Sequence, residues 1–197
     1  NRNGHSQVFM KELLTGKETM LYANQQQHLA LSKPIWHDGG STLAFAQNDH
    51  LVVISDIDGN VTTLLHEKII GQPTQWFHNQ NALLLRQRTS SGTNWFSFNL
   101  STKKLTELIS HNANQLWLDN NDSVILIKNT ELVFANGAAN WTTKANQKII
   151  NSFPHNDGIY LLLAEQPSAE NSSIQRSLWR YSYSTSDAQK LQVIPES

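Results

Sequence analysis

The sequence has 197 residues, of which 16% are charged, with a formal net charge of −1 and no cysteine. The near-neutral charge excludes the basic surface that nucleic-acid binding requires, and the lack of cysteine excludes disulfides, thiolate metal sites and thiol nucleophiles. The longest apolar runs are far shorter than the roughly 18 residues of a transmembrane helix, so we expect no membrane span within the chain. The polar residues are mainly Asn, Gln, Ser and Thr, which favour short strands and tight turns.

The first predicted element is a pair of strands within residues 7–22, joined by a Thr15-Gly16 turn. It corresponds to the outer two strands of the units that follow. We therefore expect the inner two strands to precede Asn1, in a longer protein. The amino-terminal residues also lack an initiator Met and the profile of a signal peptide.

The rest of the chain repeats a unit of an aromatic residue, a polar turn and an apolar strand. The matching turn positions, separated by 41, 41 and 36 residues, are His37, His78, Asp119 and His155. A second turn about twenty residues later, such as Asp58-Gly59, closes an outer hairpin in each unit. Four strands per roughly 40 residues, without helices, predict the blades of a β-propeller. A β-sandwich, the rival fold, has no reason to repeat at this interval.

The sequence therefore predicts an all-β chain: a β-propeller with about four complete four-stranded blades and a partial amino-terminal blade. We expect one domain or fragment over residues 1–197. The partial blade is predicted over residues 1–23. The complete blades are predicted over residues 30–66, 69–110, 111–146 and 147–197.

Three stretches resemble the repeat of TolB-type, WD-like propellers: VFMKELLTGKET from Val8, HDGGSTLAF from His37 and SDIDG from Ser55. That repeat has a polar Asp-Gly turn before an apolar strand and ends a later strand in Ser-Asp-x-Asp-Gly. The resemblance covers residues 7–66 and weakens further along, where Asn79-Gln80 and Asn120-Asn121 replace Asp-Gly.

Bacterial propellers of this type occur in envelope protein complexes of the periplasm and in the extracytoplasmic sensor part of ToxR/CadC-like membrane-anchored transcriptional regulators. They also occur as gate domains of prolyl-oligopeptidase-like peptidases. The resemblance implies a periplasmic binding or sensory module of a regulator or envelope complex, because the sequence contains no hydrolase portion. The peptidase gate domain is the alternative.

We expect no catalytic residue, metal or cofactor. The sequence lacks the Gly-x-Ser-x-Gly motif of serine hydrolases and the His spacings of zinc sites. The stretch from Asp56 to Glu67 is similar in spacing to a calcium loop, but Val61 stands where the sharp turn needs glycine. Asp58-Gly59 instead predicts a type I′ hairpin.

The six tryptophans fall into two groups. Three that recur with the repeat are predicted to lie between blades: Trp36, Trp76 and Trp117. The other three are out of that phase, and one of them could face a partner: Trp95, Trp141 and Trp179.

Binding is predicted on the face with the longer loops, such as residues 86–94 and 165–176, because such loops tolerate variation. The predicted partner-binding residues are Arg86, Arg88, Asn94, Trp95, His111 and Arg176. Arg86 and Arg88 share strand parity, and with Arg176 they could clamp a carboxylate. We expect a protein or peptide partner. An acidic peptide, a glycan and another small ligand remain open as alternatives. Charge alone also allows an ordinary solvated surface.

Overall fold

The computed structural model describes residues 6–23, 30–48, 51–65, 71–109, 115–138, 140–166 and 173–194. These residues form strands and turns, and none of them lies in an α-helix. Within the same ranges no helix has the length and apolar character needed to cross a bilayer. The fold is all-β, as predicted. The chain divides into two compact units, Asn1–His111 and Asn112–Ser197, which we describe separately.

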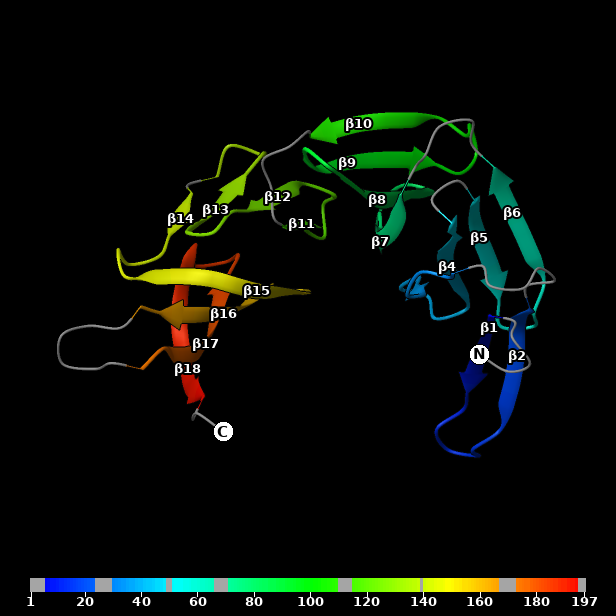
Figure 1. Cartoon of the computed structure of the whole chain (residues 1–197), viewed down its shortest axis with the longest axis horizontal. Helices are drawn as coiled ribbons and strands as arrows, with labels where there is room; N and C mark the ends of the chain where they lie inside the picture. The colour runs from blue at the N-terminus through cyan, green and yellow to red at the C-terminus, as the bar shows by residue number, and fades with distance from the viewer. Residues whose placement is uncertain are drawn as a thin grey trace. The chain divides into compact units, whose positions relative to one another are not determined.

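The first unit contains one two-stranded and two four-stranded antiparallel sheets (Figure 1). The two-stranded sheet consists of β1 (Gln7–Lys11) and β2 (Glu18–Ala23). The next sheet consists of β3 (Ile35–Trp36), β4 (Thr42–Gln47), β5 (Leu51–Asp56) and β6 (Val61–Leu65). The third consists of β7 (Gln72–Trp76), β8 (Ala82–Thr89), β9 (Gly92–Asn99) and β10 (Leu105–Ile109).

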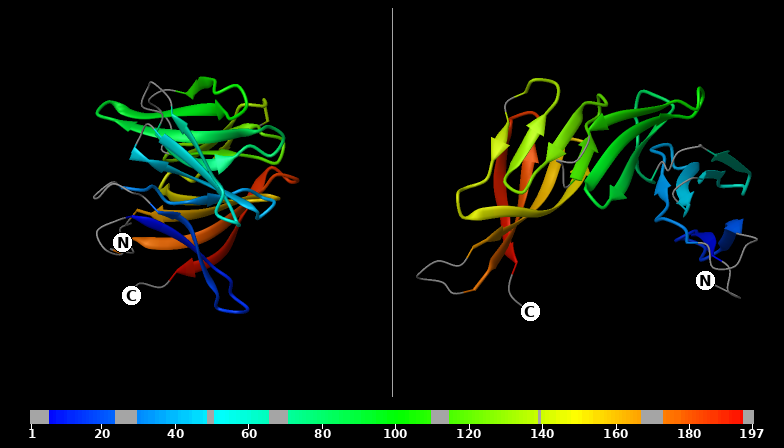
Figure 2. Two further views of the ribbon diagram at one scale, coloured as in Figure 1. Left: turned by 90° about the vertical axis from the view of Figure 1, so that its right-hand side faces the viewer. Right: turned by 45° about the horizontal axis from the view of Figure 1, so that its top comes forward.

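The second unit contains two more four-stranded sheets, twisted like those of the first (Figure 2). One consists of β11 (Gln115–Leu118), β12 (Val124–Ile127), β13 (Glu131–Phe134) and β14 (Trp141–Thr142). The other consists of β15 (Gln147–His155), β16 (Gly158–Glu165), β17 (Gln175–Ser182) and β18 (Asp187–Ile194). In every sheet, strands that are consecutive in the chain lie side by side. Four such sheets after a two-stranded one confirm the predicted propeller blades and the partial first blade.

The core of the first unit lies on both faces of β4. Successive side chains of a strand point to opposite faces. Leu43 and Phe45 pack with Val8 and Leu21 of the two-stranded sheet. Ala44 faces the other way and packs with residues of the next sheet, among them Trp76, Leu83, Leu85 and Phe98. Because both faces are buried, β4 has an almost continuous apolar sequence, and each large side chain contributes roughly 1.5–3 kcal/mol on burial.

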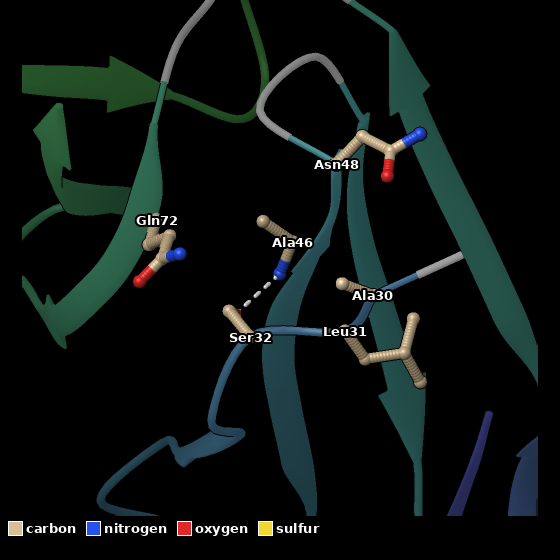
Figure 3. Close-up of a pocket in the computed structure, with 6 residues that line it drawn as sticks. All are labelled: Ala30, Leu31, Ser32, Ala46, Asn48 and Gln72. Carbon is tan, nitrogen blue, oxygen red and sulfur yellow. Dashed lines mark hydrogen bonds between the residues drawn. The ribbon is translucent and has the colours of Figure 1, made fainter. Parts of the chain in front are cut away.

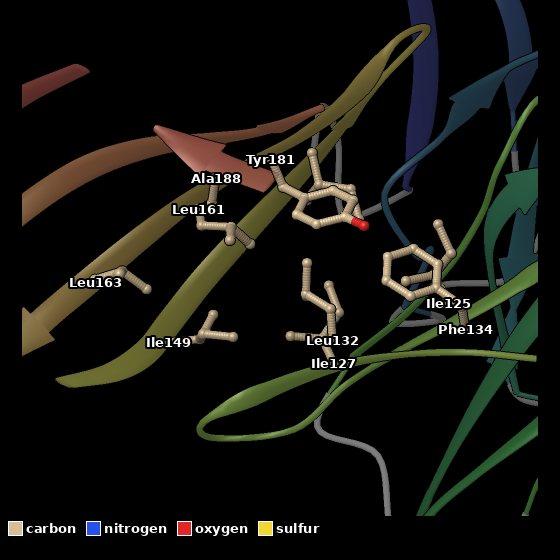
Figure 4. Packing of buried hydrophobic residues seen from close by; sticks show 10 residues of the cluster. Ile125, Ile127, Leu132, Phe134, Ile149, Leu161, Leu163, Tyr181 and Ala188 are labelled. Carbon is tan, nitrogen blue, oxygen red and sulfur yellow. The ribbon is translucent and has the colours of Figure 1, made fainter. Parts of the chain in front are cut away.

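A separate core lies between the two sheets of the second unit (Figure 4). Ile125 and Ile127 of the β11–β14 sheet pack with Leu161 of the β15–β18 sheet. The rings of Phe134 and Tyr181 stack across this core with centroids 5.3 Å apart. As in the first unit, each sheet buries an apolar face against its neighbour.

The β5–β6 turn is not the predicted type I′ hairpin, which needs positive φ at both central residues. In this turn only Gly59 has positive φ, 84°, and its N–H donates to the Asp56 carbonyl oxygen at 3.1 Å. The turn is therefore type I followed by a left-handed glycine. The Asp56 carboxylate fixes it by accepting hydrogen bonds from the backbone N–H groups of Asp58 and Asn60, at 2.9 Å each. A bond from the Asn60 side chain, followed by these backbone bonds, holds the pKa of Asp56 below its ordinary value.

Two of the three repeat tryptophans lie between sheets, as predicted. Trp76 is 5% exposed, and its Nε1 donates to the Ile35 carbonyl oxygen of the neighbouring sheet at 3.4 Å. Trp117 packs against the core of the second unit, where its Nε1 donates to Ser152 Oγ at 2.7 Å. Each indole thus joins two sheets through its packing and its one donor.

Trp36 does not fit the prediction, because it is 45% exposed. It pairs with Leu43 and therefore faces the two-stranded sheet. That sheet covers β4 and β5 but not the inner strand β3, so the indole is left in solvent within the described part of the chain. The out-of-phase Trp141 and Trp179 are partly buried against the core of the second unit.

Candidate functional site

The connections of the first unit lie at two opposite edges of its sheets, because neighbouring strands are antiparallel. Edge A is the edge with the β3–β4, β5–β6, β7–β8 and β9–β10 turns. Edge B is the edge with the β4–β5, β6–β7 and β8–β9 connections. The predicted binding face of this unit corresponds to edge B.

The connection predicted as a loop over residues 86–94 is instead a continuous hairpin. β8 extends to Thr89 and β9 begins at Gly92, so only Ser90 and Ser91 form the turn. The Thr89 hydroxyl lies 3.1 Å from the Ser91 hydroxyl and donates to the Gly92 carbonyl oxygen, also at 3.1 Å. The prediction was wrong because these strand ends are polar, and a backbone ladder forms without apolar side chains.

Arg86 and Arg88 lie two residues apart on β8, so their side chains point to the same face, in agreement with the predicted parity. Arg86 is partly buried, whereas Arg88 is exposed. Burial, followed by the charge of Arg88, lowers the pKa of the Arg86 guanidinium from its ordinary value. Within the described ranges, neither guanidinium forms a salt bridge with an acid. Two cations are thus held close together without an acidic partner from this part of the chain.

The backbone at Arg86 is fixed by a close approach from the start of β7. Gly71 has a φ of 81°, and a Cβ atom there would lie 2.3 Å from the Arg86 carbonyl oxygen. Only glycine fits this backbone conformation and this contact without strain. The next residue, Gln72, pairs with Arg86 in the ladder. Arg86 is therefore presented by a rigid sheet.

The other two predicted residues of this hairpin lie on β9. Trp95 pairs with Arg86 but is only 2% exposed, so its indole belongs to the packing and is not a surface contact, which corrects the expectation. Asn94 pairs with Gln87 and lies on the opposite face from Arg86. Its Oδ1 is buried without a hydrogen-bond partner among the described residues. A buried polar atom of this kind costs stability unless a donor reaches it.

The remaining two predicted residues do not join this hairpin. His111 lies outside the described residues. Arg176 is exposed on β17 of the second unit, where it pairs with Ala164. A clamp that combines Arg176 with the two arginines of β8 therefore stays a prediction.

A pocket of about 260 Å³ opens at edge B, and sequence reasoning missed it (Figure 3). It is lined by Ala30, Leu31, Ser32, Ala46, Asn48 and Gln72. The Ser32 hydroxyl accepts a hydrogen bond from the Ala46 N–H at 2.8 Å. Because Gln72 pairs with Arg86, the pocket and the arginine pair belong to the same edge. No local pattern could have revealed the pocket, since its walls come from separate segments.

Edge B presents hydrogen-bond donors to a ligand. In the ranges that the structure describes, no three His, Cys, Asp or Glu side chains are placed to hold a metal ion. Arg86 and Arg88 instead offer two guanidinium groups from one strand. The planar fork of a guanidinium matches the two oxygens of a carboxylate. Edge B can therefore hold an acidic side chain.

The sheets, their order and their packing define a β-propeller fold. No protein-family model and no curated protein matches the chain. Among solved structures, a TolB-like protein from Agrobacterium tumefaciens matches with a TM-score of 0.50 and 9% identity, over 96% of this chain and 89% of that one. A chain of a mitotic checkpoint complex matches with a TM-score of 0.56 and 15% identity, over 98% of this chain and 73% of that one. At such identities the likeness establishes the fold alone.

Proposed function

We propose that this chain is a non-catalytic binding module that holds an acidic segment of a protein partner at edge B. The observation that carries the proposal is the Arg86–Arg88 pair on one face of β8, without a salt bridge to an acid in the described ranges. Burial and the charge of Arg88 both disfavour the ionised form of Arg86. An incoming carboxylate would stabilise both cations, which gives an acidic partner a favourable contact.

The two arginines should contribute unequally to this contact. Arg86 is partly buried, and an ion pair shielded from water is stronger than an exposed one. Arg88 is exposed, where solvent and salt screen its charge. We therefore assign the anchoring contact to Arg86 and the attraction of the approaching partner to Arg88.

We extend the proposal to the cellular setting of the module. It would act in the periplasm, as the extracytoplasmic part of a ToxR/CadC-like membrane-anchored regulator or as a member of an envelope protein complex. The TolB-type motifs HDGGSTLAF from His37 and SDIDG from Ser55, within a propeller fold, support this setting. Fractionation of cells that produce the full-length protein tests it, and recovery of the propeller in the cytoplasm would contradict it.

A labelled peptide rich in Glu tests the binding proposal, with its Gln counterpart as the uncharged comparison. The double change R86A/R88A should weaken binding of the acidic peptide by about 2–5 kcal/mol if the pair is desolvated at the contact. The change R86K/R88K keeps the charge but removes the fork, so it should recover only part of the affinity. Fluorescence anisotropy at low and high salt measures both effects.

The matched control lies at edge A. The double change D38A/H78A alters two side chains of the β3–β4 and β7–β8 turns and should leave peptide affinity unchanged. If this control abolishes binding while the arginine variants bind normally, the function belongs to edge A and the proposal is wrong.

A further inference from the structure

A second pocket, of about 410 Å³, opens at edge A between the β3–β6 and β7–β10 sheets. Its volume falls within the roughly 300–1,000 Å³ of small-molecule sites. It is lined by residues of both sheets, and neither Arg86 nor Arg88 is among them. We call it the edge A pocket.

Part of the lining of the edge A pocket is apolar and consists of Ile54 of β5, Trp76 of β7 and Leu100 of the β9–β10 turn. The indole of Trp76 is held in place by two contacts. Its Nε1 donates to a backbone carbonyl oxygen at 3.4 Å, and the ring of His37 meets it edge-on, with centroids 5.0 Å apart at 84°. The position of the Trp76 indole is therefore fixed before a ligand binds and does not need to be ordered on binding.

The rest of the lining is polar. It includes Ser41, Thr42 and Thr62, and none of the three makes a side-chain hydrogen bond among the described residues. The amide of Asn81 is oriented by donation from its Nδ2 to Ser101 Oγ at 3.0 Å. No Asp, Glu, Lys or Arg lines the pocket within the described part of the chain. The lining therefore favours an uncharged ligand with several hydroxyl groups.

The second unit shows why this pocket exists. Leu100 and Tyr183 each follow the third strand of their sheets, and the backbone N–H of each donates to a carbonyl oxygen in the first turn of the same sheet. The acceptor is the Asn81 carbonyl oxygen for Leu100, at 2.9 Å, and the Asp157 carbonyl oxygen for Tyr183, at 3.0 Å. The ring of Tyr183 packs against the core, 6.3 Å from that of Tyr181, and its burial raises the pKa of Tyr183. Leu100 is smaller than Tyr183. The space that an aromatic ring occupies in the second unit is therefore left open in the first.

From these contacts we propose that the edge A pocket binds a neutral sugar residue. A sugar ring has an apolar face of C–H groups, which suits the apolar residues Ile54, Trp76 and Leu100 of the lining. Its hydroxyls can donate to and accept from the hydroxyls of Ser41, Thr42 and Thr62 and the Asn81 amide. This site is separate from edge B, so the proposal stands or fails independently of the one for an acidic partner.

Nuclear magnetic resonance of the labelled protein tests the proposal. Glucose, galactose, mannose and N-acetylglucosamine are titrated to about 100 mM, well above the millimolar affinity expected of so small a ligand. At least one of them should shift the Trp76 indole N–H signal and the Ile54 methyl signals. Glucuronate, which carries a charge, should bind more weakly than its neutral counterpart.

The blocking variant is Leu100→Tyr, which places in the first unit the residue that the second unit accepts. It should weaken sugar binding at least tenfold. Thr62→Val removes one exposed hydroxyl without a change of shape and should weaken binding severalfold, and R86A/R88A should not alter it. The proposal is overturned if no sugar of the panel shifts these signals, if Leu100→Tyr folds and binds as well as the parent chain, or if a capped Ala-Ser dipeptide binds more tightly than every sugar.

Discussion

Asp38 Oδ2 lies 2.5 Å from Nδ1 of His78, so a polar contact joins the β3–β4 turn to the β7–β8 turn of the neighbouring sheet. The Asp38 side chain is 67% exposed and that of His78 is 23% exposed. Solvent screens such a pair, and we expect a coupling of about 0.2–1 kcal/mol. A double-mutant cycle with D38N and H78Q in urea unfolding measures it. A coupling of zero at low salt would show that the pair does not stabilise the sheets. A small coupling means that D38A/H78A still folds, so that this variant can serve as the control for peptide binding.

The core between the first two four-stranded sheets should be sensitive to truncation. Phe98 is fully buried there, so Phe98→Ala should reduce the free energy of unfolding by about 3–5 kcal/mol. Leu14 is 95% exposed at the β1–β2 turn. Leu14→Ala should therefore change the free energy of unfolding by less than about 0.5 kcal/mol. Urea denaturation compares the two variants, and equal losses would contradict the assigned packing.

Gly71 should tolerate no side chain. A Cβ atom would lie 2.3 Å from the Arg86 carbonyl oxygen at a φ of 81°, so Gly71→Ala should destabilise the chain by about 1–3 kcal/mol. Gly39→Ala is the matched control, because its nearest contact would be 3.5 Å and its φ is not in the left-handed region. That control should be neutral or slightly stabilising. Thermal unfolding of both variants tests the contrast.

Asp157 should make the second unit sensitive to acid. A hydrogen bond with His155 and, to a lesser extent, the charge of Arg180 lower the pKa of the Asp157 carboxyl. Since the folded pKa is below the unfolded one, this carboxylate stabilises the fold above the unfolded pKa, and the effect is lost as the pH falls through the folded pKa. Asp157→Asn should therefore lower the urea midpoint of unfolding at pH 6. Between about pH 5 and pH 2 the midpoint of this variant should fall less than that of the parent chain. Parallel pH profiles of the two proteins would contradict this assignment.

The strands of the fold could be predicted because their signals are local. The repeat that places His37 and His78 41 residues apart also fixes where each turn and apolar strand lies. The exposure of Trp36 could not be predicted in this way, because it depends on how many strands the facing sheet contains. The type of the Asp56 turn likewise depends on which backbone N–H groups the carboxylate reaches.

The candidate sites were less accessible to sequence reasoning. The parity of Arg86 and Arg88 is a property of one strand and could be predicted, but the burial of Trp95 depends on packing. The edge A pocket depends on the space between two sheets, where Leu100 meets Trp76. The sequence indicates the edge A pocket only when Leu100 is compared with Tyr183, which stands at the corresponding position of another sheet.

The bond that Leu100 and Tyr183 each donate to the first turn of their sheets has a counterpart at Ile57, which donates to the Ser41 carbonyl oxygen at 3.0 Å. This bond fastens the outer hairpin of a blade to its inner hairpin beyond the ends of the strands. Amide protons at these three turn positions should therefore exchange with solvent as slowly as those within the strands, although turns usually exchange quickly. We therefore expect a blade that is fastened in this way to open as one cooperative unit.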